Sequence, residues 1–584
     1  MPNKTFRRFR LLGGQNSEVN PLIMAEGETE LMLNATTDKL GSWQKRLGTR
    51  MFGNQSVSGK DILGLHHYSD FAGKTFEPLI VINDSTNTNS DIFRIVKTQL
   101  NGAITTATTT ITVDGTSLFA SSGNIEIEGD LITYTGKTAT TLTGVTGITN
   151  SHADNSIVRQ WKITNADDTQ GKKARFANFL DRAIRLNGSN AMKAYNGSTW
   201  ETTGNPINPN KAATASTYIE VFQSRVFTAG GSSHPDRLYA SSLPSTAPAT
   251  GETTGSITWS TGTQIIDKVG STGFYIDINP EDGQNITGLE RNGNLLLIFK
   301  ERSLYTWDGN STQADVLVDI GAISQEAITT INNITFFLGR SKKNLGIYAF
   351  TGGYPKLISR KIKRWLDNIN QANLVDIVSG ADEDHVYFYV GNIIFSNDSI
   401  YGTRTFNNVW LVYTLSQDSW SIYDDLHAQA FGYFVSSKAE LLVFGDNTGK
   451  TFEIGRGQTD DNGEGKTSID MEIWSGEETF LAPELTKSLQ SIEVFSQQAQ
   501  ETEVHFRYDR NPDWQDLGAL GARYSYFNAP QRFEPNIGRT LQFQFANNTS
   551  FQSQIDGYVL NVESDEEPRV ERGTGGRGTR RGNI

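Results

Sequence analysis

The sequence predicts an all-β protein whose largest part is a β-propeller of about six or seven blades. Residues 283–309 have the pattern of a β-meander, with apolar strands separated by turns at 292–294 and 300–302. Aromatic residues that follow a similar apolar strand recur at intervals of roughly 40 to 66 residues. They are Tyr195, Tyr239, Tyr305, Tyr348, Tyr413 and Phe452. The 56 glycines supply many tight turns between such strands.

A repeat of about 40 to 50 residues is typical of a propeller blade, because one four-stranded sheet cannot bury both faces without neighbours. Two intervals are longer. In the first, residues 241–263 are rich in Ser, Thr and Pro and predict a surface loop. In the second, residues 360–370 predict a helix with Ser359 as its N-cap. A first blade lies upstream, around residues 79–96, and a strand from either end of the chain can close the ring.

The predicted propeller comprises residues 61–97 and 161–457, with an insertion between the two parts. Short alternating strands and glycine turns in residues 98–160 predict a small β-barrel or sandwich module, which serves as a spacer or binds a glycan through its Thr-rich face. Residues 468–563 predict a C-terminal β-sandwich after a polar hinge. The Gly/Arg-rich residues 564–584 predict a disordered tail.

Residues 1–60 have few strand patterns and are interpreted as an N-terminal arm. Basic and aromatic residues alternate in it, so the arm either grips a partner or packs along its own domain. The candidate assembly contacts are Arg7, Arg8, Arg10, Trp43 and Arg46.

Charge and composition exclude several classes of function. The net charge of −13 argues against a nucleic-acid reader of the usual basic kind, and suits a surface along which DNA slides without sticking. The absence of cysteine excludes disulfides, thiolate catalysis and cysteine metal sites. No apolar run approaches the roughly 20 residues of a membrane span, and we expect neither a span nor a signal peptide.

None of the candidate phosphate-, calcium- or zinc-binding motifs has the residue spacing that its ligand requires. Gly-Lys-Thr occurs four times, each time without the glycine that a phosphate loop needs five positions earlier. A calcium loop that starts at Asp460 would need a carboxylate where Met471 stands. The seven histidines show no zinc-binding spacing. We therefore expect no cofactor, no metal and no catalytic residue. A propeller glycosidase stays open as an alternative because acidic runs occur at 382–384 and 424–425.

Three stretches carry a resemblance to a known family: the leader (Pro21, 25–27, Asn34 and 40–48), the meander at 286–309, and residues 539–543 followed by 556–558. Together they resemble the tail-nozzle or packaged-DNA stabilisation proteins of short-tailed bacteriophages. The inserted module, with the segments 125–129 and 132–136, is similar to small β-modules of phage tail and fibre proteins.

The resemblance implies a non-enzymatic structural protein of the phage tail, assembled in the host cytoplasm. Its subunits would form a ring, as a hexamer, below the portal and adaptor proteins, and would contact tail fibre or plug proteins. Packaged DNA would be retained by this ring and ejected through it. The resemblance assigns no role to a single residue. A receptor- or glycan-binding tail protein is the alternative that uses the inserted module.

Overall fold

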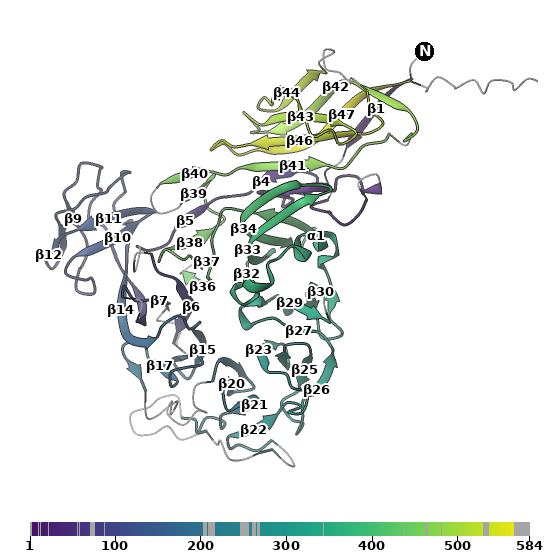
Figure 1. Ribbon diagram of the computed structural model, residues 1–584. Helices are drawn as coiled ribbons and strands as arrows, with labels where there is room; N and C mark the ends of the chain where they lie inside the picture. The colour runs from purple at the N-terminus through teal and green to yellow at the C-terminus, as the bar shows by residue number, and fades with distance from the viewer. Residues whose placement is uncertain are drawn as a thin grey trace, which may run out of the picture.

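Seven antiparallel sheets of at least four strands each form the blades of a β-propeller in the computed structural model (Figure 1). This confirms the predicted all-β propeller. The structure describes residues 3–9, 11, 13–20, 23–54, 57, 59–70, 76–86, 88–202, 207, 216–245, 256–259, 264–265, 269–342, 344–436, 439–461, 465–480, 482–529 and 537–565.

The blades follow one another in chain order, and each begins with its innermost strand, except blade five, in which a short strand precedes the innermost one. Blade one contains β6 (Ile62–Ser69), β7 (Phe76–Asn83), β8 (Asn89–Gln99) and β14 (Ile157–Thr169). Blade two contains β15 (Arg175–Phe179), β16 (Arg182–Leu186), β17 (Lys193–Tyr195) and β18 (Trp200–Glu201). Blade three contains β19 (Tyr218–Phe222), β20 (Arg225–Gly231), β21 (His234–Ala240) and β22 (Phe274–Asp277). Blade four contains β23 (Ile286–Asn292), β24 (Leu295–Lys300), β25 (Leu304–Trp307) and β26 (Asp315–Val318).

The last three blades differ in how their sheets are completed. Blade five contains β27 (Gly321–Ala322), β28 (Ile328–Ile331), β29 (Ile334–Ser341), β30 (Asn344–Phe350) and β31 (Lys356–Leu357). Blade six contains β32 (Val378–Ala381), β33 (His385–Asp398), β34 (Gly402–Thr414) and β35 (Ser419–Tyr423). Blade seven contains β36 (Ala430–Ser436), β37 (Ala439–Gly445), β38 (Thr451–Ile454) and, from the N-terminal region, β5 (Thr49–Met51).

The ring is closed around the axis. The inner strands contact one another in the order β6, β15, β19, β23, β28, β32 and β36, and β36 contacts β6. The outer strand of blade seven is β5, which pairs antiparallel with β38. A propeller closed by an N-terminal strand has no open blade edge at its seam, so the first and last parts of the propeller are locked together.

The aromatic repeat marks the third strand of successive blades. Tyr239, Tyr305 and Tyr348 lie on β21, β25 and β30. Each faces a residue of the second strand, namely Thr228, Ile298 and Phe337. Tyr195, Tyr413 and Phe452 occupy the third strands of blades two, six and seven. The spacing of these aromatic residues in the sequence therefore corresponds to the spacing of successive blades.

The insertion in blade one contains five short strands. They are β9 (Thr110–Thr112), β10 (Gly123–Ile127), β11 (Asp130–Tyr134), β12 (Gly136–Lys137) and β13 (Thr141–Thr143). Strand β10 pairs with β14, so that β10 and β11 extend the sheet of blade one outward. The module has a core of its own around Ile111, Ile125 and Leu142.

A β-sandwich follows the propeller. Its strands are β41 (Met471–Ser475), β42 (Thr486–Gln497), β43 (Glu503–Tyr508), β44 (Gln515–Ala519), β45 (Tyr524–Asn528), β46 (Leu541–Asn547) and β47 (Gln554–Asp565). The hinge before it forms the hairpin of β39 (Thr459–Asp461) and β40 (Lys466–Ser468). The predicted tail lies outside the described residues from position 566 onward.

The interpretation of residues 1–60 as an arm needs a correction. Strands β1 (Asn3–Phe9), β3 (Ala35–Thr36) and β4 (Trp43–Lys45) belong to the sheet of β42, β45 and β47. Strand β2 (Thr29–Leu33) lies between β35 of blade six and β41 of the sandwich. Strand β3 pairs locally with β4, but β1, β2 and β4 also pair with strands that come hundreds of residues later in the chain.

The predicted helix is shorter than expected. Residues 360–370 hold the 3₁₀ turn η4 (Ser359–Ile362) and the α-helix α1 (Lys363–Asp367). Ser359 does not cap this helix, because it lies inside η4 and its hydroxyl accepts the backbone N–H of Ile347 at 2.9 Å. Buried Trp365 anchors the segment in the core. No helix of the described residues is long and apolar enough to cross a membrane.

Candidate functional site

Charged side chains meet at the propeller axis, where the inner strands begin. A cavity of about 170 Å³ is lined there by residues of β6, β32 and β36 and by Lys173, Arg175 and Glu326. Arg175 forms an ion pair with Glu326 at 2.5 Å, and Lys173 donates to the backbone oxygen of Gln429. The guanidinium of Arg175 also lies 4.9 Å from the ring centre of Tyr218.

These axial charges neutralise one another. Burial raises the pKa of Glu326, but the charges of Arg175 and Lys173 outweigh it, and the pKa is lowered overall. Burial lowers the pKa of Lys173. The cavity is smaller than the roughly 300–1,000 Å³ of typical small-molecule sites. The axis at this end is therefore occupied by the protein's own ion pairs.

A second axial feature is a pair of carboxyl groups on neighbouring inner strands. Glu220 lies on β19 and Glu290 on β23, and both are partly buried. Burial and the nearby Glu290 raise the pKa of Glu220 to about 8, and burial raises that of Glu290 to about 7. Two such groups hold a proton at neutral pH. The sequence did carry a signal, a single glutamate within a short, largely apolar strand, but the motif search missed it.

Arg46 lies inside the junction between the propeller and the sandwich. Its guanidinium makes a two-pronged ion pair with Asp460, at 2.8 and 2.6 Å, and donates to Asn34 at 2.9 Å. Asn34 in turn donates to Asp424 at 2.6 Å. Arg46 is 3% exposed. Its hydrogen bonds tie the hinge hairpin to the region of blade six.

The other predicted contacts divide into two groups. Trp43 is 1% exposed, packs against Phe545 and donates to the backbone oxygen of Gly13 at 3.2 Å. Trp43 and Arg46 are therefore not available to a neighbouring subunit, which corrects that assignment. Arg7 and Arg8 lie on β1, whose backbone pairs with β47, and their side chains are outside the described part of the chain. Arg10 is likewise outside it.

The acidic run at 382–384 is a structural cluster. Asp382 accepts a hydrogen bond from His385 Nδ1 at 3.0 Å, and Asp38 accepts one from Nε2 of the same ring at 2.9 Å. Tyr387 also donates to Asp382, at 2.8 Å. Asp460, the first residue of the calcium-loop pattern that the sequence analysis rejected, forms an ion pair with Arg46. Among the described residues, no group of three or more His, Asp or Glu side chains is arranged to hold a metal ion.

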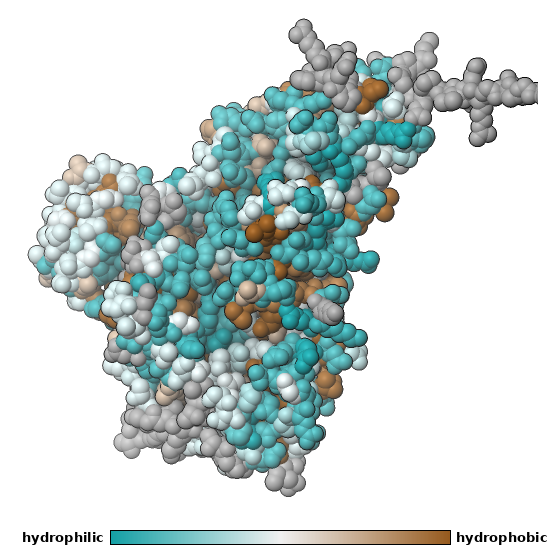
Figure 2. All heavy atoms as spheres, in the orientation of Figure 1, coloured by the Kyte–Doolittle hydropathy of each residue, from teal (hydrophilic) through white to brown (hydrophobic). Residues whose placement is uncertain are grey.

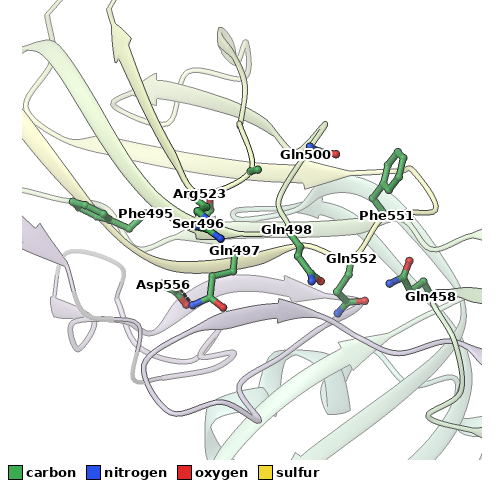
Figure 3. A pocket seen from close by; sticks show the side chains of 11 residues that line it. Gln458, Phe495, Ser496, Gln497, Gln498, Gln500, Arg523, Phe551, Gln552 and Asp556 are labelled. Atoms are coloured by element: carbon green, nitrogen blue, oxygen red, sulfur yellow. Dashed lines mark hydrogen bonds between the residues drawn. The ribbon is translucent and has the colours of Figure 1, made fainter.

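A large cleft lies on the sandwich, with a volume of about 790 Å³. Figure 3 shows glutamine side chains from the hinge, from the end of β42 and the loop after it, and from the loop before β47, with Phe495 on one side and Phe551 near Gln458 on the other. Within the cleft, Asp556 accepts a hydrogen bond from Gln497 Nε2 at 2.9 Å. We call this feature the glutamine cleft; its glutamines are Gln458, Gln497, Gln498, Gln500 and Gln552. Sequence reasoning missed it, because its residues come from four separate segments, at 458, 495–500, 522–523 and 551–556.

Comparisons with known proteins add a general similarity. No protein-family model matches the chain, and no curated protein matches it. Solved structures that match include the Dos1 propeller (9% identity, 70% of this chain and 95% of that chain, TM-score 0.33) and the AfRom2 CNH domain (9%, 61% and 94%, TM-score 0.28). The Neurospora crassa Pan2 WD40 domain also matches (8%, 61% and 88%, TM-score 0.26). The propeller assignment rests on the sheet order and ring closure of this chain itself.

Proposed function

We propose that the protein is a structural subunit of the tail of a short-tailed bacteriophage. In this proposal several copies, six by the family resemblance, form a ring below the portal and adaptor. The ring retains packaged DNA and provides the channel for its ejection. The sequence resemblance suggests this role, and the rigid connection between the propeller and the sandwich supports it.

One observation supports this role most directly: a single nine-stranded sheet runs from blade six into the sandwich. Its order is β32-β33-β34-β35-β2-β41-β46-β43-β44. Leu33 of β2 pairs with Ile422 on one side and with Glu472 on the other. Buried Glu30 of the same strand accepts Gln542 Nε2 at 2.7 Å and forms an ion pair with Arg510. Two modules joined by backbone hydrogen bonds move as one body, as a ring component must.

The propeller axis does not suit passage of DNA. The ion pair of Arg175 and Glu326 and the cavity of about 170 Å³ leave no room for a duplex within one subunit. A channel for DNA would lie between subunits in this proposal. The net charge of −13 disfavours sticking of phosphates to such a channel wall.

Exposed apolar side chains offer surface for contacts between copies. Figure 2 shows a largely hydrophilic face with hydrophobic side chains gathered over the sixth blade. Tyr354, Leu357, Val375 and Ile394 in the fifth and sixth blades are 79%, 46%, 69% and 58% exposed. In this proposal, contacts between copies would cover these side chains.

The test is the oligomeric state of the purified full chain, alone and with portal and adaptor proteins. Native mass spectrometry and negative-stain electron microscopy should show a ring with a central hole. A chain that stays monomeric with those partners would contradict the proposal.

Charge reversal of Arg7, Arg8 and Arg10 tests the basic end of the chain more cleanly than its deletion. Deletion would remove β1 from the sandwich, because β1 pairs with β47 over its whole length. The triple Arg→Glu variant should keep the melting temperature and lose ring assembly. Reversal of Lys97 and Lys172, which are exposed and distant in sequence from the apolar side chains named above, is the control and should leave assembly intact.

A further inference from the structure

We propose that the glutamine cleft binds an oligosaccharide. The cleft, at about 790 Å³, lies within the range of roughly 300–1,000 Å³ that encloses small ligands. This inference does not depend on the ring proposal, because it concerns a site within one subunit. It also differs from glycan binding by the inserted module, which lies elsewhere in the chain.

The chemistry of the lining suits sugar hydroxyl groups. Each glutamine amide presents a donor and an acceptor, and each sugar hydroxyl group does the same. Gln458, Gln498 and Gln500 are exposed side chains on the cleft. Gln497 is held in place because its Nε2 donates to Asp556, which also accepts Ser42 Oγ at 2.7 Å. The amide oxygen of Gln497 is the group left to receive a ligand hydroxyl.

One amide carries an unsatisfied acceptor. Gln552 Nε2 donates to the backbone oxygen of Lys45 at 2.5 Å, which fixes the side chain. Its Oε1 is buried and has no hydrogen-bond partner among the described residues. Buried polar atoms are nearly always paired. This oxygen is shielded from solvent, so a bound molecule donates to it only after the Gln552 side chain turns its oxygen toward the cleft.

The two aromatic rings fit the flat faces of sugars. Phe495 is 37% exposed and Phe551 is 46% exposed, and Figure 3 shows them on opposite sides of Gln497, Gln498 and Gln552. The ring of Phe495 also contacts that of Tyr524. An exposed phenylalanine contributes little to the stability of the fold, because its ring is not removed from water. Beside polar groups, such a ring offers an apolar platform for the C–H face of a pyranose. A ring on each side of these amides indicates a ligand of more than one sugar unit.

The backbone of the cleft is also constrained. Gln498 and Glu501 have φ values of 53° and 62°, in the left-handed region that non-glycine residues seldom occupy. Backbone strain of this kind clusters at ligand sites. The loop after β42 thus presents Gln498 and Gln500 in one defined arrangement.

Charge argues against a nucleic-acid ligand. The described lining residues include one cation, Arg523, and one anion, Asp556. Phosphate chains are recognised by several cations, which this cleft does not offer. A sugar chain that is neutral, or carries an occasional acidic unit near Arg523, matches this balance.

The experiment probes the full-length protein with a broad array of oligosaccharides from bacteria, plants and animals, followed by calorimetry with the best binder. We expect binding, and at least about tenfold weaker affinity for Phe551→Ala and for Gln552→Ala. Tyr526→Ala, which removes a 50% exposed ring outside the cleft, is the matched control and should bind like the parent.

Two results would overturn the proposal. One is a parent protein that binds no oligosaccharide of the array at concentrations up to about 1 mM. The other is binding that Phe551→Ala and Gln552→Ala leave unchanged, which would place the sugar elsewhere. Thermal melts of all variants show whether each is folded. Since Phe551 is exposed, its replacement should not lower the melting temperature.

Discussion

Glu290 and Glu220 place two carboxyl groups at the propeller axis, where a proton is retained. Their pKa values of about 7 and about 8 lie above the ordinary value of 4.5. The folded chain therefore binds more protons than the unfolded chain between about pH 4.5 and 8, and stability falls as the pH rises through this window. Glu290→Gln removes a charge that the fold disfavours. We expect it to raise the melting temperature by about 2 °C or more near pH 9.

The same variant should have little effect near pH 5, where the parent carboxyl is already protonated in the folded state. Glu440→Gln, at an exposed position, is the control. Calorimetric melts at the two pH values measure the difference. A stabilisation that is equal at both would rule out the proposed protonation.

His385 also has a raised pKa, but here the cause is a pair of partner charges of opposite sign rather than burial. Burial lowers its pKa, but Asp38 and Asp382 outweigh burial and raise it to about 10. The stabilisation is fully present below the ordinary pKa of 6.5 and is lost as the pH rises through about 10. His385→Gln should thus lower the melting temperature more near pH 6 than near pH 10. His234→Gln, at an exposed site, should change neither value.

At the scale of single elements, β5 closes the propeller with three residues. Met51 pairs with Phe452 and is 1% exposed in the core between blades six and seven. Met51→Asp would bury an unpaired charge and open the seam, at a cost of about 3 kcal/mol or more. Urea denaturation measures the loss. Arg50→Ala on the same strand, with a side chain 43% exposed, should cost less than about 1 kcal/mol.

The sequence predicted elements where the pattern was local. The aromatic of each third strand and the apolar strand before it lie within one blade, so their spacing was visible without the structure. The strands β1, β2, β4 and β5 were not visible as sheet partners, because each pairs with a segment hundreds of residues away, and only β3 has its partner nearby, in β4. Such pairing leaves no short-range period to detect.

The candidate sites were harder to predict for the same reason. Arg46 and Trp43 looked like contacts for a partner because basic and aromatic residues are common at interfaces. Their burial depends on Asp460 and Phe545, which come from the hinge and the sandwich. The glutamine cleft, built by four separate segments, had no motif of its own.

At the scale of the whole molecule, the junction should make the propeller and the sandwich unfold together. Arg46→Ala leaves Asp460 buried without its partner, and such losses cost about 3–5 kcal/mol. We expect the parent to melt in one calorimetric transition, and the variant to melt lower or in two steps. Arg46→Ala with Asp460→Ala should recover part of the loss, because no lone charge then remains buried. An Arg46→Ala protein as stable as the parent would show that this pair does not hold the modules.

The pairing of β1 with β47 and of β5 with β38 also has a consequence for biosynthesis. A ribosome that adds about 5–20 residues per second needs roughly half a minute to two minutes for this chain. During that time the leading strands wait without their partners. A prematurely terminated chain lacks the strands that would receive them and keeps exposed edges that invite aggregation or proteolysis. Completion of translation thus acts as a checkpoint before a subunit is competent to assemble.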